Sequence, residues 1–177
     1  MTTNIRTLVV VLVATLAGGL GASAQAVSLA DIGHDVYKSE VDGFEIAVPH
    51  DCFKVSPTEN GRVYVCDVKE GRVVVQVEAS DPPVNTDAEL AAYLEGFRGT
   101  LNTATGVKVL GETPLHLGSY KGAAFQLTVN GDKTYMTTLC WARSTFTMTA
   151  QANSTVPNAA KLISDAIQSF AFTAKPK

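Results

Sequence analysis

The segment from Gly61 to Ala79 constrains the fold of this chain more than any other stretch. Two runs of β-branched residues flank Lys69–Gly71, and such runs around a glycine-containing turn are typical of a β-hairpin. Side chains alternate across a strand, so Val73 and Val75 point to one face of the second strand and Gln76 to the other. The sequence therefore predicts an antiparallel sheet that places its more apolar face on a core.

Similar alternating runs predict further strands on both sides of this hairpin, at residues 43–48, 52–56, 107–117, 123–129, 134–142 and 145–152. Asp81–Pro83 is expected to end the hairpin, because proline cannot donate a hydrogen bond to a ladder. Asn130–Gly131 predicts a type I′ turn, which needs positive φ at both central residues. Another turn is expected at Arg143–Ser144.

Two segments carry the 3.6-residue period of an amphipathic helix. The first begins at Thr86, where Thr86 and Glu89 match a capping box, in which each side chain accepts a hydrogen bond from a free backbone N–H. The second is expected to open at Pro157, whose missing N–H costs nothing there. The expected buried stripes are Leu90, Leu94, Phe97 and Leu101 in the first helix, and Ala159, Ile163, Ala166, Ile167 and Phe170 in the second. Hairpin-connected strands with two separate helices predict an α+β domain.

The first 24 residues have the features of a secretory signal peptide. Arg6 provides a positive start, residues 8–17 are apolar, and Ala22–Ala24 is a small-residue cleavage site. A retained membrane anchor is the alternative, but the apolar run ends at Leu20 and falls short of the roughly 20 residues that span a bilayer. Cleavage between Ala24 and Gln25 is therefore expected, with a weaker second choice two residues later.

The rest of the chain is expected to form one domain. Residues 25–39 are predicted to be a flexible lead-in, residues 40–172 a single folded domain, and residues 173–177 a frayed tail. Apolar residues make up 46% of the chain and charged residues 18%, which is a globular composition. The net charge is −3, and the absence of a basic cluster argues against nucleic-acid binding and against attachment to an anionic membrane.

Three cysteines allow at most one internal disulfide. Cys52 and Cys66 lie equally far from Glu59, the centre of the turn expected between their strands, so antiparallel pairing places them opposite one another. A Cys52–Cys66 bridge with Cys140 free is therefore predicted. Cys66–Cys140 is the competing pair, if the later strands lie beside the hairpin. A slip of one residue in the register would send the thiols of Cys52 and Cys66 to opposite faces.

Few residues point to catalysis or to metal binding. His50–Cys52 combines a base with a thiol, but a turn histidine beside a disulfide cysteine explains the same pattern. Asp31, His34 and Asp35 lie in the expected lead-in, which gives them no fixed geometry around a metal. In the pair Cys140–Trp141, one side chain is expected to face the core. The sequence also lacks a phosphate-binding glycine loop and a nucleophile elbow, so no catalytic residue, cofactor or metal site is predicted.

Over residues 40–172 the chain resembles the PsbP-like superfamily, which is named for an extrinsic subunit of photosystem II and is similar to small exported bacterial proteins of the DcrB and LpqN type. The resemblance lies at packing positions: Phe44, Ile46, Pro49, Ala91, Tyr93, Leu94, Gly122, Phe125, Leu127, Ser169 and Phe170. It implies an α/β/α sandwich around a central antiparallel sheet of about seven strands. It carries over no metal-binding or partner-binding residue.

The function expected from these features is that of an exported, non-catalytic binding or accessory module of the bacterial cell envelope, in the periplasm or secreted. Its partner is expected to be another envelope protein or a small ligand, with no nucleic acid and no stable membrane insertion after signal removal. The candidate partner surfaces are the loops at Pro49–Asp51 and Asp81–Pro83. The alternative is a small periplasmic enzyme, hydrolase-like, whose active site is assembled from distant residues.

We predict that protein recovered from the cell envelope begins at Gln25, because the small residues at positions 22 and 24 match a signal peptidase site. The intact mass of the purified protein measures this directly. A full-length chain held in the membrane fraction would contradict the prediction.

Overall fold

The computed structural model describes residues 35–49 and 51–173. The predicted signal peptide, its cleavage site at Ala24 and Gln25, and residues 25–34 of the expected lead-in lie outside these ranges. The elements follow in the order β1 (Val36–Ser39), β2 (Phe44–Ala47), β3 (Lys54–Pro57), β4 (Gly61–Val68), β5 (Gly71–Val84), α2 (Asp87–Thr103), β6 (Val107–Leu117), β7 (Tyr120–Val129), β8 (Asp132–Ala152), α3 (Ala159–Gln168) and β9 (Ala171–Phe172). Strand β1 falls inside the range expected to be a lead-in.

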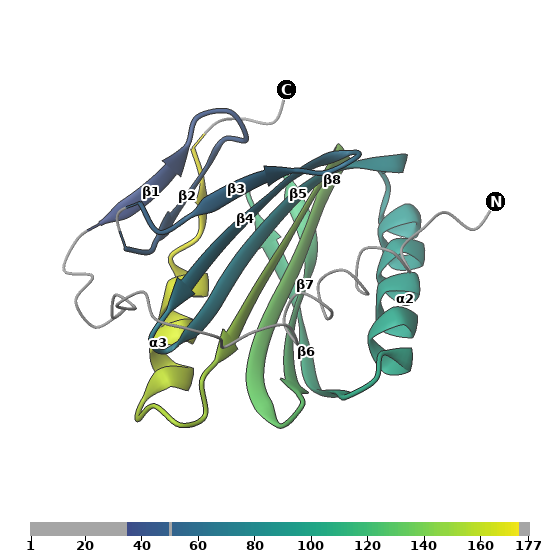
Figure 1. Ribbon diagram of the computed structural model, residues 1–177. Helices are drawn as coiled ribbons and strands as arrows, with labels where there is room; N and C mark the ends of the chain where they lie inside the picture. The colour runs from purple at the N-terminus through teal and green to yellow at the C-terminus, as the bar shows by residue number, and fades with distance from the viewer. Residues whose placement is uncertain (1–34, 50, 174–177) are drawn as a thin grey trace.

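The strands form two antiparallel sheets, which Figure 1 shows side by side. The larger sheet has six strands in the order β3-β4-β5-β8-β7-β6. The smaller sheet has the order β1-β2-β9, and so joins the first strands of the described chain to the last. In the described part of the chain, no helix is long and apolar enough to cross a bilayer.

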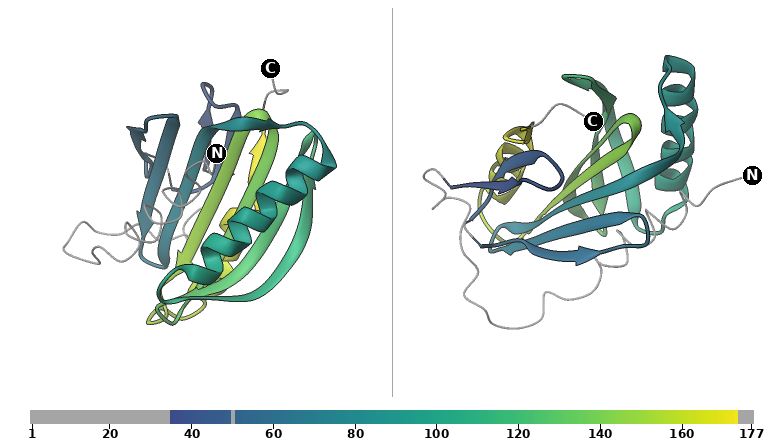
Figure 2. Two further views of the ribbon diagram at one scale, coloured as in Figure 1. Left: turned by 90° about the vertical axis from the view of Figure 1, so that its right-hand side faces the viewer. Right: turned by 90° about the horizontal axis from the view of Figure 1, so that it is seen from above.

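The larger sheet is covered on both faces. Helix α3 and the small sheet lie on one face and α2 lies on the other, as the view from above in Figure 2 shows. Val73 and Val75 of β5 are fully buried in the core on the α3 side, whereas Val74 packs in the core under α2. The predicted alternation along β5 is therefore confirmed, and so is the α+β fold with helices on both sides of an antiparallel sheet.

Strand β8 folds back on itself. The Thr138 and Thr147 hydroxyl oxygens lie 3.5 Å apart, although nine residues of extended strand would span roughly 30 Å. Residues 132–140 pair with β7, and residues 144–152 pair with β5. The reversal lies at Ala142, with φ 50°, beside the turn expected at Arg143–Ser144. With its two limbs counted separately, β8 accounts for the expected sheet of about seven strands.

The turns and caps that depend on local chemistry are mostly as predicted. Asn130 and Gly131 have φ 53° and 94°, as a type I′ turn requires. The Glu89 backbone N–H donates to the Thr86 hydroxyl, while the Glu89 carboxylate accepts from the Thr86 backbone N–H, so the capping box is present. Residues 80–83 make no ladder pairs, but β5 continues past the two prolines to pair again at Val84.

The start of α3 was predicted wrongly. The helix begins at Ala159, and Pro157 lies in the turn before it. Asn158, at the cap position, has φ 62°, in the left-handed region that asparagine tolerates better than most residues. This conformation separates Pro157 from the helical path. The expected stripe still packs inward, with Ile163 fully buried.

Cys52 and Cys66 are joined in a disulfide, with a Cα–Cα distance of 5.0 Å, and Cys140 is free and buried. The register behind this prediction was wrong by one residue. Lys54 pairs with Val65, so continuing the ladder would place Asp67, not Cys66, opposite Cys52. Cys52 nevertheless reaches Cys66 because it precedes β3 and is not held in the ladder. Asp51, whose φ is 54°, lies in the turn that ends at Cys52, where the Cys52 backbone N–H donates to the Pro49 carbonyl at 3.1 Å.

We predict that Cys52→Ser lowers the free energy of unfolding by about 3 kcal/mol, because the bridge closes a loop of roughly 15 residues in the unfolded chain. Urea unfolding followed by circular dichroism measures the change. Reductant should destabilise the wild type to a similar extent and leave the Cys52→Ser variant unchanged. A variant as stable as the oxidised wild type would show that the bridge does not support the fold.

Candidate functional site

Among the described residues, those that the sequence singled out for chemistry form no catalytic group. Cys52 is in the disulfide and offers no thiol. Asp31, His34 and His50 lie outside the described residues. The remaining histidine of the chain, His116, is exposed on β6, where it pairs with Lys121 across the strands. Within residues 35–49 and 51–173, no three His, Cys, Asp or Glu side chains gather in a way that could hold a metal ion.

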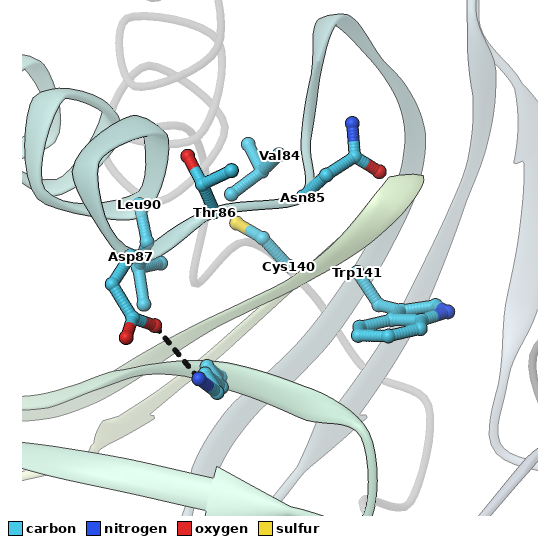
Figure 3. A pocket seen from close by; sticks show the side chains of 8 residues that line it. Val84, Asn85, Thr86, Asp87, Leu90, Cys140 and Trp141 are labelled. Carbon is cyan, nitrogen blue, oxygen red and sulfur yellow. Dashed lines mark hydrogen bonds and ion pairs between the residues drawn. The ribbon is translucent and has the colours of Figure 1, made fainter.

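A small pocket lies at one end of the larger sheet, where β5 leads into α2 and β8 reverses (Figure 3). Its cavity volume is about 40 Å³, far below the range of roughly 300–1,000 Å³ for small-molecule sites. A cavity of this size holds only a few water-sized groups. The residues that line it are Val84, Asn85, Thr86, Asp87, Leu90, Lys121, Cys140 and Trp141.

The pocket combines apolar and aromatic groups from different elements. Val84 at the end of β5 is 8% exposed, and Cys140 on β8 is 2% exposed. Leu90, on the first turns of α2, is half-buried. Trp141 follows Cys140 and is 37% exposed, so the expectation that one of this pair faces the core is confirmed. A partly exposed indole beside buried apolar groups is typical of a contact surface for a ligand or a partner.

The rim of the pocket carries an ion pair. Lys121 Nζ on β7 donates to Asp87 Oδ1 at 2.7 Å, which the dashed line in Figure 3 marks. This hydrogen bond and the positive charge of Lys121 lower the pKa of the Asp87 carboxyl. The Asp87 side chain is nevertheless 84% exposed. Solvent therefore screens the attraction between Asp87 and Lys121, and the ion pair is weak. Asp87 is therefore an ionised carboxylate that can exchange one cationic partner for another.

The backbone around the pocket is fixed by several local contacts. The Glu89 carboxylate accepts from the backbone N–H groups of Asn85 and Thr86, at 2.8 and 2.9 Å. The Asp81–Pro82 peptide bond is cis, and the Ser80 hydroxyl donates to the Pro82 carbonyl at 2.8 Å. The loop that precedes α2 is thus tied to the helix it introduces. The expected partner loop at Asp81–Pro83 adjoins this pocket directly.

The Cys140 thiol is held in its protonated form. Burial raises its pKa from 9.0 to about 11, against hydrogen bonds from Thr145, Tyr93 and Thr138 that act in the opposite direction. A nucleophilic cysteine needs a lowered pKa. Cys140 therefore lines the pocket as a buried, protonated thiol and not as an activated nucleophile.

A second polar cluster joins the small sheet to β4. The Tyr64 hydroxyl lies 2.9 Å from the Ser39 hydroxyl and donates to an Asp42 carboxylate oxygen. Arg62 Nη1 donates to the other oxygen of Asp42 at 2.9 Å. Burial, together with the bond to Asp42, raises the pKa of Tyr64 to about 12. Each of these groups is used in holding the β1–β2 turn against the larger sheet, so this cluster stabilises the fold.

The sequence predicted the loop beside the pocket and missed the pocket itself. Its lining residues come from three segments, at 84–90, 121 and 140–141. The one available signal was Trp141, the single tryptophan of the chain, next to the turn at 143–144. The other expected partner loop lies elsewhere: Pro49 is buried and Asp51 is exposed, and neither lines the pocket.

We predict that Cys140 reacts slowly with Ellman's reagent at pH 8 in the native protein and rapidly in denaturant, because the folded thiol has a pKa of about 11. A raised pKa favours the protonated folded state, so this stabilisation is complete below pH 9 and is lost as the pH rises towards 11. Between pH 9 and pH 11 the free energy of unfolding should therefore fall less for the Cys140→Ala variant than for the wild type. Equal reaction rates in the native and denatured states would contradict the assignment.

Comparison with known proteins supports the fold described above. No protein-family model matches the chain, and no curated protein matches it. Among solved structures, cyanobacterial PsbP (CyanoP) from Synechocystis sp. PCC 6803 is similar with a TM-score of 0.51 and 12% identity, over 88% of this chain and 99% of that one. A crystal structure from Bacteroides thetaiotaomicron gives a TM-score of 0.37 at 10% identity, over 76% of this chain and 47% of that one. The narrower likeness to DcrB-type and LpqN-type proteins stays a prediction. The similarity to CyanoP, together with the sheet order and the two covering helices, shows that the chain has the PsbP-like fold.

Proposed function

We propose that this protein is an exported, non-catalytic binding or accessory module of the bacterial cell envelope. The observation that carries the proposal is the pocket beside Trp141, in which an exposed indole, buried apolar groups and an exchangeable ion pair lie together. Such a combination contacts a partner and supplies no activated nucleophile, because the Cys140 thiol is protonated at neutral pH. The PsbP-like fold agrees with an accessory role, since CyanoP carries the name of a photosystem subunit.

Export is supported by the disulfide and by the predicted signal peptide. A Cys52–Cys66 bridge persists in oxidising compartments and is rare in the cytosol. The bridge lies near the edge strand β3, away from the pocket, so it supports the fold of the module and leaves the contact surface free.

The proposal predicts that the tagged protein captures a specific partner from the native envelope fraction and that Asp81→Lys weakens this capture. Asp81 is exposed beside the pocket, so a reversed charge there alters the contact surface with little effect on folding. Asp165→Lys on α3, also exposed and far from the pocket in the fold, is the matched control. Quantitative mass spectrometry of the captured proteins, with melting temperatures for each variant, measures the effect.

The same experiment separates binding from catalysis. His116→Ala should leave partner capture and any cellular activity nearly unchanged, because His116 is exposed on β6 and lies outside the pocket lining. Loss of an essential base typically reduces a rate by orders of magnitude. If His116→Ala abolished turnover of a substrate while the melting temperature stayed the same, the protein would be an enzyme and the proposal would be wrong.

A further inference from the structure

We propose that the Asn130–Gly131 turn is a site of spontaneous modification, at which the Asn130 amide is converted to a carboxylate. This inference is independent of the proposed binding function. It starts from the sequence, which has two Asn-Gly pairs, Asn60–Gly61 and Asn130–Gly131. Asparagine is thermally labile, and it reacts fastest before glycine, which has no side chain to shield its backbone nitrogen or to restrict its rotation. The fold determines which of the two pairs can react in the native protein.

The reaction needs only water. The Gly131 backbone nitrogen attacks Cγ of Asn130, a Cγ–N bond forms, and the amide nitrogen leaves as ammonia with the proton of the Gly131 N–H. Water then opens the cyclic imide. Cleavage of the new bond gives aspartate, and cleavage of the original peptide bond to Gly131 gives isoaspartate. The peptide group between the two residues must rotate before its nitrogen can reach Cγ, so contacts that hold this peptide group slow the reaction.

The peptide group of Asn60–Gly61 is held by its neighbours. The Asn60 carbonyl accepts from the Ala79 backbone N–H at 2.9 Å, and the Gly61 carbonyl accepts from the Thr58 backbone N–H at 2.9 Å. Gly61 is the first residue of β4 and lies so close to β5 that a Cβ built on it would clash with the Val77 carbonyl. Rotation here would break these contacts, so the fold protects Asn60 although this residue is exposed.

The Asn130–Gly131 pair lies outside the ladder of its hairpin. The last pair of β7 and β8 is Val129–Asp132, and the two residues between them form the turn. Both are exposed, and nothing lies within 4 Å of the position that a Cβ on Gly131 would occupy. The Asn130 N–H donates to the Gly106 carbonyl at 2.9 Å, but this bond lies before Asn130 and does not involve the peptide group that must rotate. Asn130 is therefore the reactive asparagine of the two in the folded protein.

The product changes the charge beside helix α2. Oδ1 of Asn130 lies against Gly106, where it would clash with a Cβ. Gly106 follows the C-cap residue Ala104 by two positions, and the last turn of α2 has no basic residue. A negative charge near the C-terminal end of a helix is unfavourable. Isoaspartate also adds a carbon to the backbone of the turn, so the two-residue type I′ geometry is lost. Conversion therefore loosens the β7–β8 hairpin and makes the stability of the protein depend on its age.

Peptide mapping of the purified protein measures both sites at once. Trypsin releases Asn60 in the peptide 55–62 and Asn130 in the peptide 122–133, and neither peptide contains another asparagine. At pH 8.5 we expect Asn130 of the native protein to be converted on the order of tenfold faster than Asn60, because opening the Asn60 turn breaks two backbone hydrogen bonds. In guanidinium chloride with reductant the two rates should be equal, since both asparagines then precede a glycine in an unfolded chain. Asn60 is thus a matched control within the same molecule.

Variants test the consequence for stability. Asn130→Asp reproduces the aspartate product and should lower the melting temperature by about 1–4 °C. Gln126→Glu is the matched control, because it introduces the same charge at an exposed position of β7 four residues before the turn, and it should lower the melting temperature less. The loss in Asn130→Asp should shrink at high salt, which screens the charge.

Two results would overturn the modification site: native Asn60 converted as fast as Asn130 or faster, or native Asn130 still intact when the denatured chain is fully converted. The consequence for stability has its own test. If Asn130→Asp melts at the wild-type temperature, or if its loss is the same at low and high salt, the charge beside α2 does not destabilise the protein and that part of the inference is wrong.

Discussion

The structure depends on one group of aromatic rings that connects the small sheet to the large one. Phe44 on β2 lies 5.1 Å from Tyr64 on β4 and 5.5 Å from Phe170 after α3, measured between ring centroids. A three-stranded sheet with strands this short is not stable alone in water. Packing against these rings holds the small sheet in place. Each ring pair adds about 0.5–1.5 kcal/mol to the stability gained by burying apolar area. The hydrogen bonds of Tyr64 to Ser39 and Asp42 fix the same contact at its polar edge.

The opposite face of the sheet has a different organisation. There α2 packs through Leu94, Phe97 and Leu101, and the Tyr93 hydroxyl lies 2.9 Å from the Thr138 hydroxyl. The face of the large sheet under α3 and the small sheet is a closed core that supports the fold. The face under α2 instead leaves a pocket where three chain segments meet. The capping box and the pairing at Val84 fix the loop before α2, so the pocket is already formed in the protein alone. Pre-formed sites lose less conformational entropy on binding.

Features with a local physical cause were predictable from the sequence, and those made by distant pairing were not. The capping box at Thr86 and the turn at Asn130–Gly131 follow from a few neighbouring residues. The disulfide partners were correct although the register was not, because Cys52 lies outside the ladder and can adjust. Position 142, where β8 reverses, is an alanine with φ 50°, a conformation that its residue type does not indicate. The reversal itself was expected, as the turn at Arg143–Ser144. The pocket was not foreseen because its lining comes from three separate segments, at 84–90, 121 and 140–141.

Strand β9 supplies the third strand of a sheet whose other two strands stand at the beginning of the described chain. Phe172 pairs with Phe44, and its ring lies 3.9 Å from that of Tyr120. Because synthesis runs from the N-terminus, this sheet lacks its third strand until Phe172 has left the ribosome. Until then the β1–β2 pair has no third strand beside β2, and the long loop to β9 must close before their contacts form. The small sheet is therefore among the last parts of the fold to be completed.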